Sequence, residues 1–367
     1  MPGLPASQYF DLGQPFNTEN IVMTPNLTPA RILETATAFW PAKVLLSAVE
    51  LGLFTRLASG PLDNASLAKA LGIRADRSLD FFDALVALGF LERERASASA
   101  TYRNTPETDL FLDRNKPTYT GGMPEMLNAR LFRFWNGLTE ALRTGEAQSE
   151  SKGGGSSFFE TLYADAARLE QFLSAMASLQ IGNFMTLANQ FDFSKYRTVL
   201  DVGGANAQLS RVLAARHPRL SLTSFDLPQV APIARREVEK AGMLSRIEVA
   251  SGDFFSDAFP RADVILMGNI LHDWSEDGKR QLIQKAHAAL RPGGALIAIE
   301  NVIDDERRQN AFGLLMSLNM LIELGASGGF DYTGAQYDAW CKAAGFARTE
   351  VVPLTGPASA AIAYKAS

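Results

Sequence analysis

Cysteine is nearly absent from this sequence of 367 residues, since Cys341 is the single example. A disulfide within the chain needs two cysteines, and a zinc site built on cysteine needs several, so both are excluded. A chain without disulfides is typical of a reducing compartment. We therefore expect a cytoplasmic protein and predict no metal site.

An excess of basic charge and a long apolar run are also lacking. The formal net charge is −5 and the isoelectric point is near 5.4, which disfavours a general attraction to nucleic acid or to anionic membranes. No stretch approaches the roughly 20 apolar residues that span a bilayer. The first residues also lack the basic and then apolar order of a signal peptide. We expect neither a nucleic acid nor a membrane as a partner.

The hydrophobic content of 47% is ample for real cores, and the length is sufficient for two domains. Residues 1–27 show no sustained period and are interpreted as an arm. Helical spacing then runs from Thr28 to Gly52 with a restart at Pro41. Two further helices, at residues 66–71 and 77–88, and a hairpin-like stretch at 90–103 complete the outline of a winged helix over residues 28–112.

The charges on this predicted winged helix argue against DNA binding. The helix that would enter a groove carries Asp76, Asp80 and Asp83 against Arg74 and Arg77. Such a surface would repel phosphates about as strongly as it attracts them. We therefore interpret residues 28–112 as a packing or dimerisation module.

Residues 113–190 hold two more helical stretches on either side of a Gly- and Ser-rich loop, Ser149–Ser157. Both stretches are rich in large apolar side chains, most of which we assign to the core. Some are candidates for lining an apolar substrate pocket, because Met and aromatic side chains adapt to flat ligands. These candidates are Phe132, Trp135, Phe172 and Met176.

Strands and helices alternate from residue 191 to the C-terminus. The predicted strands are 198–202, 220–225, 246–250, 263–267, 295–300, 348–353 and 358–364. Such alternation predicts a mostly parallel sheet with helices on both faces. Ligands of such sheets bind at the carboxyl ends of the strands.

A glycine-rich break, Gly203–Gly204, follows the first of these strands and leads into a helix near Asn206. Glycine permits a tight turn and a close approach of ligand to backbone. A plain turn in an unliganded fold is the alternative interpretation. Asp226, at the end of the next strand, favours a ligand because its carboxylate can accept hydrogen bonds from both hydroxyls of a ribose.

Two further motifs follow the next strands. Asp253 and Phe254 offer an acceptor for an adenine amino group and a face for its ring, with a solvated turn as the alternative. His272 lies after the strand at 263–267, where a group titrating near neutrality can act as a general base. The other two histidines, His217 and His287, are placed in a turn and in a helix.

Six motifs in order give this chain a family resemblance: Val-Leu-Asp-Val-Gly-Gly, Phe-Asp-Leu-Pro, Gly-Asp-Phe-Phe, Asn-Ile-Leu-His-Asp-Trp-Ser-Glu-Asp, Leu-Arg-Pro-Gly-Gly-Ala-Leu and Ala-Ala-Gly-Phe. From about Thr28 to Tyr364 the chain resembles the S-adenosylmethionine-dependent small-molecule O-methyltransferases, such as plant caffeate and bacterial tailoring enzymes. The resemblance implies an α/β fold: a Rossmann-like class I methyltransferase domain at 191–367 and an N-terminal, mainly α, winged-helix dimerisation domain. It also implies a homodimer and a small-molecule acceptor.

The resemblance implies roles for individual residues. It makes His272 the catalytic base, with Glu300 and Asp331 as its acidic partners. It places S-adenosylmethionine against Gly203, Gly204, Asp226, Leu227, Asp253, Phe254, Gly268 and Trp274. Asn319 and Met320 fall where the family contacts substrate.

The chain departs from the family pattern at four positions. Ala205 and Ala207 replace two loop glycines, Gly268 replaces the lysine of plant members, and Asp331 is one methylene shorter than the usual glutamate. Three other functions stay open at this point: methyl transfer to a thiol or thioether, a non-methylating reaction on the same fold, and a DNA-binding regulator that senses a small molecule.

Overall fold

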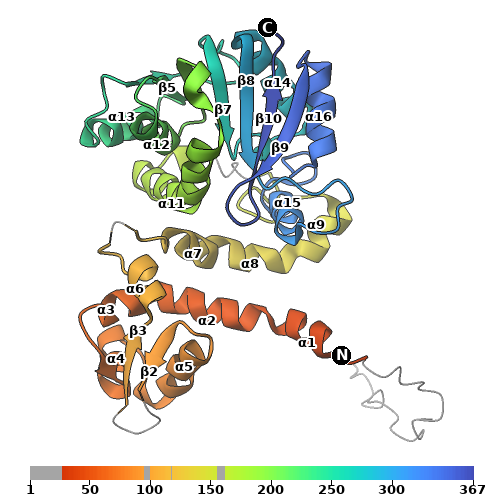
Figure 1. The fold of residues 1–367 in the computed structure, drawn as a ribbon. Coiled ribbons are helices and arrows are strands. Elements are labelled where there is room, and N and C mark those ends of the chain that lie inside the picture. Colours follow the sequence, from red (N-terminus) through yellow and green to blue (C-terminus); the bar gives the residue numbers. More distant parts are fainter. Residues whose placement is uncertain (1–26, 95–99, 117, 155–161) are drawn as a thin grey trace, which may run out of the picture. The chain divides into compact units, whose positions relative to one another are not determined.

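The computed structural model describes residues 27–94, 100–116, 118–154 and 162–367, drawn as a ribbon in Figure 1. Apart from residue 27, the predicted N-terminal arm lies outside the described residues. The chain divides into two units, Met1–Lys43 and Val44–Ser367. Each unit is described by itself below.

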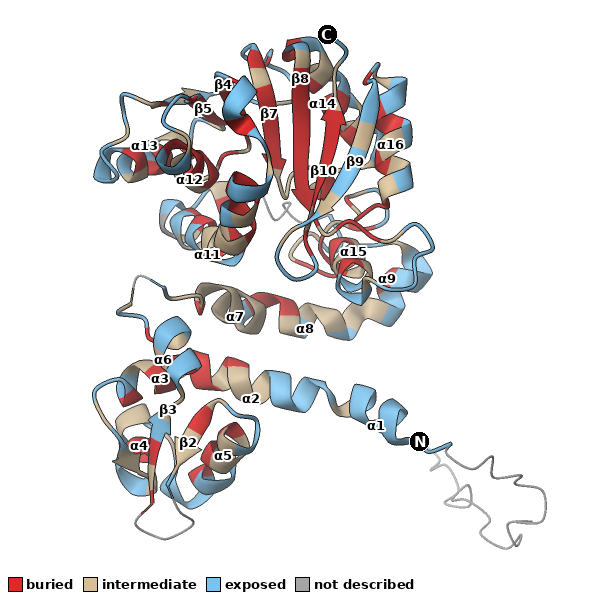
Figure 2. Cartoon of the chain, viewed as in Figure 1, coloured by how far each residue is buried: buried red, intermediate tan, exposed pale blue. Residues whose placement is uncertain are grey.

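Two consecutive helices, α1 (Ala30–Thr37) and α2 (Phe39–Glu50), begin the described chain and confirm the expected break near Pro41, which falls in the first turn of α2. Their outer residues are largely exposed (Figure 2), among them Ile32 at 71% and Trp40 at 61%. By length and composition alone, Ala30–Glu50 qualifies as a candidate membrane span. The expectation that no stretch would pass this test was therefore wrong, because charged residues are sparse enough in this 21-residue stretch to leave an apolar window of 18 residues.

Small helices and a three-stranded sheet form a compact core after residue 44. The helices are α3 (Leu53–Leu57), α4 (Asn64–Leu71), α5 (Ala75–Ala87) and α6 (Pro106–Leu112), and the strands are β1 (Leu62–Asp63), β2 (Leu91–Arg93) and β3 (Thr101–Asn104). The predicted helices at 66–71 and 77–88 and the hairpin are confirmed. The sequence reading missed α3 and α6, each of which is shorter than two full helical turns. Phe54, Phe82 and Tyr102 fill this core.

Short helical pieces connect this region to the large sheet. They are α7 (Gly122–Met126), the π-helical turn η2 (Leu127–Leu131), α8 (Phe132–Phe134), η3 (Trp135–Gly137), α9 (Leu138–Thr144) and the long α11 (Ala166–Gln190). Of the predicted Ser149–Ser157 loop, residues 149–154 form turns, and 155–157 lie outside the described residues. π-Helical turns are rare in proteins, and those that occur are often found at functional sites.

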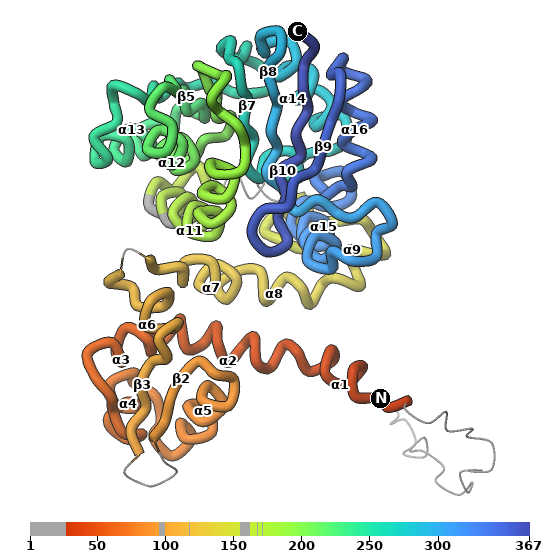
Figure 3. Tube along the Cα trace, viewed as in Figure 1, coloured from red at the N-terminus to blue at the C-terminus, as the bar shows by residue number. Residues whose placement is uncertain are grey.

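The large sheet has seven strands in the order β6-β5-β4-β7-β8-β10-β9. Their bounds are β4 Thr198–Val202, β5 Ser221–Asp226, β6 Ile247–Ser251, β7 Ala262–Gly268, β8 Leu290–Glu300, β9 Arg348–Pro353 and β10 Ser359–Tyr364. Neighbours from β6 to β8 are parallel, whereas β10 pairs antiparallel with both β8 and β9. Figure 3 traces the chain from β8 through α15 (Ala311–Leu324) and α16 (Gly334–Ala343) to this terminal hairpin. The mostly parallel sheet predicted from the alternation is confirmed.

Helices cover both faces of the sheet, as predicted. On one face α14 (Glu276–Ala289) and α16 pack against side chains such as Leu200, Ile265 and Leu296. On the other face α11, α12 (Gln208–Arg216) and α13 (Ala231–Lys240) pack against the alternate residues, including Val199 and Ile297. Strands buried on both faces read as near-continuous apolar runs, and Figure 2 shows β8 buried where it crosses the middle of the sheet.

The strand order reverses between β4 and β7. The chain runs outward from β4 through β5 to β6, and then returns to β7 and β8 on the other side of β4. Such a switch point opens a crevice at the carboxyl ends of the strands, where α/β proteins bind their ligands. The polar motifs singled out in the sequence therefore meet at one edge.

Candidate active site

Asp226 fastens the glycine loop to the end of β5. Its two carboxylate oxygens accept hydrogen bonds from the backbone N–H of Ala205 at 2.8 Å and of Leu227 at 2.7 Å. Burial raises the pKa of Asp226 to about 6, while these two hydrogen bonds oppose the rise. The structure thus brings Asp226, Leu227 and the loop together, as a shared ligand site requires.

The loop between β4 and α12 needs unusual backbone conformations. Gly203 has a φ of 68°, and a Cβ atom there would lie 2.2 Å from Cδ1 of Ile270. Ala205 and Ala207 also have positive φ values, 50° and 61°, a region that costs a non-glycine residue about 1–2 kcal/mol. The alanines therefore keep the conformation that glycine favours. They delay the start of α12 to Gln208, two residues beyond the expected position.

Aromatic side chains form a wall after β6 and β7. The ring of Phe254 packs edge-on against Trp274 with centroids 5.7 Å apart, and Phe255 does so at 4.6 Å. Lys285 holds this segment by donating from Nζ to the carbonyl oxygens of Phe254 at 2.6 Å and Phe255 at 2.9 Å. Asp253 is exposed, and one of its oxygens accepts from the N–H of Phe255 at 2.8 Å.

His272 lies in a tight turn that we call the His272 turn, residues Ile270–Trp274, directly after β7. The single 3₁₀ turn η5 (Leu271–Asp273) buries its imidazole, so that only 7% of the residue is exposed. Gly268 ends β7 and is half-buried. The position expected from the motif, at the ligand end of a strand, is the position observed.

Glu300, the last residue of β8, holds the start of the His272 turn through its carboxylate. One of its oxygens accepts from the N–H of Ile270 at 3.2 Å and of Leu271 at 2.9 Å. Its second oxygen is buried and has no hydrogen-bond partner within the described residues. Burial raises the pKa of Glu300 to about 7, against the attraction of His272.

Asp331 reaches His272 from a loop that is far away in the sequence. The N–H of Ile303 donates to the carbonyl oxygen of Tyr332 at 2.9 Å, which fixes this loop beside the end of β8. Oδ1 of Asp331 then lies 3.7 Å from Nδ1 of His272. Both residues are buried, so water screens this contact little.

Asp273 is a third acidic group beside His272, and the sequence did not single it out. Its Oδ1 lies 3.4 Å from Nε2 of His272, the ring nitrogen that does not face Asp331. Burial alone would lower the pKa of His272, but the carboxylates of Asp273, Glu300 and Asp331 outweigh burial and raise it to about 10. The imidazolium form is therefore strongly stabilised in the site as it stands.

Ligand atoms of His272, Glu300 and Asp331 all lie within 4.8 Å of one another. We interpret this grouping as an acid–base unit rather than a metal centre, because carboxylate oxygens of Asp331 and Asp273 face the two ring nitrogens of His272. A carboxylate that faces Nδ1 fixes the tautomer and orientation of an imidazole. Such a group can accept a proton at Nε2 and hold it.

A buried polar network connects two of the predicted substrate residues. Trp135 donates from Nε1 to Oδ1 of Asn319 at 3.0 Å, and Nδ2 of Asn319 donates to Glu323 at 2.7 Å. Arg130, in η2, donates to the other oxygen of Glu323 at 2.7 Å and forms two bonds of 2.8 Å to Glu150. Both ends of the Asn319 amide are therefore engaged by Trp135 and Glu323, which fixes its orientation.

The other predicted substrate residues fall in different environments. Phe172, on α11, packs in the same apolar cluster as Leu227 and Ala205 and so lies beside the glycine loop. Met176 is half-buried on α11, Phe132 is half-buried at the start of α8, and Met320 is buried on α15. Of these residues, Phe172 is the one that shares an apolar cluster with a residue of the glycine loop.

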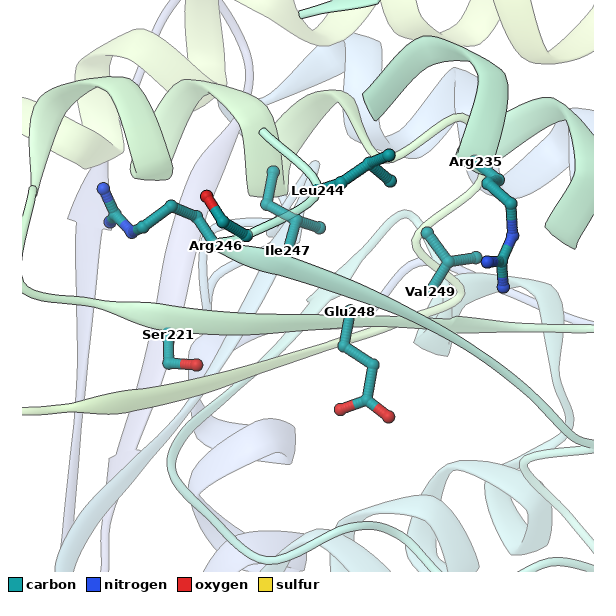
Figure 4. Close-up of a pocket in the computed structure, with 8 residues that line it drawn as sticks. Ser221, Arg235, Leu244, Arg246, Ile247, Glu248 and Val249 are labelled. Carbon is teal, nitrogen blue, oxygen red and sulfur yellow. The ribbon is translucent and has the colours of Figure 1, made fainter. Parts of the chain in front are cut away.

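A separate hollow is drawn in Figure 4 at the edge strand β6. Its lining includes Ser221, Arg235 and Ile247. Ser221 and Ile247 are the first residues of β5 and β6, so this hollow lies at the amino ends of the strands. It is therefore distinct from the candidate active site at the carboxyl ends.

Family models match most of the chain. The O-methyltransferase domain matches residues 135–347, and the O-methyltransferase dimerisation domain matches residues 33–114. The bacterial protein TcmO of Streptomyces glaucescens, the tetracenomycin polyketide synthesis 8-O-methyl transferase, is 42% identical over 337 residues, which cover 92% of this chain and 97% of TcmO.

Two further relatives differ in the acceptor that their names give. OxyT of Streptomyces rimosus, an N,N-dimethyltransferase, is 35% identical over 288 residues, covering 78% of this chain and 82% of OxyT. The crystal structure of human N-acetylserotonin methyltransferase in complex with S-adenosylmethionine superposes with a TM-score of 0.84 at 29% identity. That superposition covers 94% of this chain and 99% of the human one.

Proposed function

Because the chain belongs to the family of S-adenosylmethionine-dependent small-molecule O-methyltransferases, we propose that His272 accepts the proton of an acceptor hydroxyl during methyl transfer. The observation that carries this role is the burial of its imidazole between the carboxylates of Asp331 and Asp273. Nδ1 faces Asp331, so we assign Nε2, which lies 3.4 Å from Oδ1 of Asp273, as the nitrogen that takes the proton. Base catalysis of this kind supplies about a hundred- to ten-thousandfold in rate.

The residues at the strand ends fit the cofactor. Asp226 would accept the ribose hydroxyls, Gly203 and Gly204 would leave room at the backbone for the methionine part, and Phe254 with Trp274 would border the adenine. We assign Asp253, Leu227 and Gly268 to the same site. When bound, S-adenosylmethionine supplies a methyl group already activated as a sulfonium, together with one positive charge.

The charge state of His272 decides whether it can act as a base. With a pKa of about 10, the imidazole would hold its proton at neutral pH. Any positive charge beside the carboxylates of Asp273, Glu300 and Asp331 opposes the imidazolium and lowers that pKa. Base catalysis is therefore coupled to loading of the site.

We assign residues 28–112 to a winged-helix-like module through which two copies of the chain pair. The dimerisation family matches residues 33–114, a range that includes α2 and all but the first three residues of α1. On α5, Arg74 pairs with Asp76 at 2.8 Å, and Asp83 accepts from Tyr102 at 2.7 Å. This pairing disfavours DNA binding. We propose a cytoplasmic homodimer without a nucleic acid or membrane partner, in which residues 113–190 line the pocket and 191–367 bind the cofactor.

A flat aromatic hydroxyl compound is the acceptor class that we favour. The pocket candidates Trp135, Phe172 and Met176 offer apolar or aromatic contact surface. TcmO, by its name, acts in polyketide synthesis. OxyT, by its name, methylates nitrogen, so an amine acceptor is the second candidate. A thioether acceptor has no proton to lose and would not need His272.

Calorimetric titration with S-adenosylmethionine and S-adenosylhomocysteine tests the cofactor site first. We expect micromolar binding of both, and loss of binding in Asp226→Ala. A panel of polycyclic phenols, aryl amines and thiols then identifies the nucleophile by mass spectrometry of the methylated product. Methylation of amines or thiols but of no phenol would contradict the proposed acceptor class.

A further inference from the structure

Lys279 is a fully buried lysine beside the candidate active site. It lies in the second turn of α14, its exposed fraction is 0%, and its Nζ donates to the carbonyl oxygen of Trp274, the last residue of the His272 turn. The ammonium also lies 3.6 Å from the centre of the Phe330 ring. Phe330 immediately precedes Asp331. Lys279 thus contacts the two segments that carry His272 and Asp331.

Burying an ammonium is costly unless other charges or dipoles compensate it. Within the described residues, no carboxylate oxygen lies within 4.0 Å of Nζ, so a direct ion pair does not provide the compensation. Burial lowers the pKa of Lys279 to about 8, although nearby carboxylates raise it. Those carboxylates are Glu300, Asp331, Asp273 and Glu276.

The first three of these carboxylates also surround His272. Glu276, on α14, is already paired with Arg280, so the remaining field is shared by Lys279 and His272. Three carboxylates, of which Glu300 and Asp331 are buried and Asp273 is half-buried, thus face two cationic groups. A cation at position 279 offsets part of the negative charge of these carboxylates, which an apolar side chain of similar length cannot do.

We propose that Lys279 is a positioning residue of the candidate active site, which holds the last carbonyl of the His272 turn and supplies positive charge that balances the carboxylates around His272. Its catalytic consequence rests on the proposed role of His272. The placement and the charge balance themselves do not depend on that role.

The sign of the effect follows from electrostatics. Two positive charges in one field disfavour each other, so each holds its proton less tightly while the other is charged. The pair should therefore titrate in two coupled steps. Because the pKa of Lys279, about 8, lies below that of His272, about 10, removing the amine abolishes the lower step and leaves the His272 midpoint in place. Placing a permanent charge there makes His272 release its proton at lower pH.

Nuclear magnetic resonance of imidazole-labelled protein measures this directly, because the chain has three histidines. His272→Gln assigns the His272 signal, and His217 and His287 serve as internal references. In Lys279→Met we expect the lower of the two steps to vanish and the midpoint of His272 to stay near its original value, because Lys279 has already lost its proton where His272 titrates. In Lys279→Arg, whose guanidinium stays charged, we expect the midpoint to fall below that of the unchanged protein.

A matched control is Lys69→Met, which removes an exposed lysine on α4 and should leave all three signals unchanged. If the methionine variant does not fold, the arginine variant and Lys279→Gln decide. A His272 titration that is the same in the unchanged, neutral and arginine proteins would overturn the proposal. Because no methyl transfer is measured, an error in the assigned base would leave this test intact.

Discussion

Gly329 passes so close to His272 that a Cβ atom on Gly329 would lie 2.0 Å from the His272 carbonyl oxygen. No side-chain rotation relieves such a contact, because the opposing atoms belong to the backbone. The absence of a side chain at position 329 therefore lets the loop that carries Asp331 lie directly on the His272 turn.

Gly329→Ala should separate Asp331 from His272. We expect methyl transfer to fall by about a hundredfold, since a displacement of one ångström can have that effect, and we expect the His272 midpoint to fall as a carboxylate moves away. Gly182→Ala on α11 is the matched control, because it also adds a methyl group, its φ is not positive, and the new Cβ meets only the Thr355 side chain at an ordinary 3.5 Å. Equal activity in the two variants would show that the close contact is not needed.

His272→Gln should slow turnover by about a hundred- to ten-thousandfold on an acceptor found in the screen. The affinity for S-adenosylhomocysteine should not change, because the cofactor residues are left in place. His287→Gln is the control, since His287 packs on Phe346 outside the site. Full activity of His272→Gln on a phenol would exclude the general-base role, whereas full activity on a thioether would fit that alternative acceptor.

Arg130→Met should destabilise the protein and disturb the pocket wall. The substitution leaves the carboxylates of Glu150 and Glu323 without their buried partner, a loss that costs about 3–5 kcal/mol. Urea unfolding measures the free energy. Arg74→Met removes an exposed ion pair, with side chains 81% and 59% exposed, and should have no measurable effect. An equally small effect of Arg130→Met would contradict the importance of the network.

Asp201→Asn should change the pH dependence of stability. Asp201 is buried under the glycine loop, where burial raises its pKa from 3.8 to about 7 despite a 2.8 Å hydrogen bond from Ser210. Between about pH 4 and 7 the folded chain therefore holds a proton that the unfolded chain has released, so stability falls as the pH rises through this window. The penalty is fully present above pH 7.

Asparagine at position 201 keeps the shape and removes that penalty. We expect Asp201→Asn to raise the urea midpoint at pH 8 and to leave it nearly unchanged at pH 4. The exposed Glu248→Gln is the control and should alter neither value. The urea midpoint of Asp201→Asn is compared with that of the unchanged protein at each pH. If this difference were smaller at pH 8 than at pH 4, the expected sign would be contradicted.

The sequence by itself determined the strands of the parallel sheet and the helices between them, because each depends on short apolar runs and on local periodicity. It also placed Asp226 and His272 correctly at strand ends, since parallel strands bring those ends to one edge. The motif around His272 determined the family, because residues that share one turn are neighbours in the chain.

Only the tertiary structure decided which distant groups meet at His272. The approach of Asp331 depends on the contact at Gly329, and the burial of Lys279 depends on how α14 packs under Phe330. The pKa of His272 depends on the combined field of the carboxylates of Asp273, Glu300 and Asp331, which lie on separate elements. Sequence periodicity and motif spacing do not predict such a combined field, because electrostatic fields act through space and not along the chain.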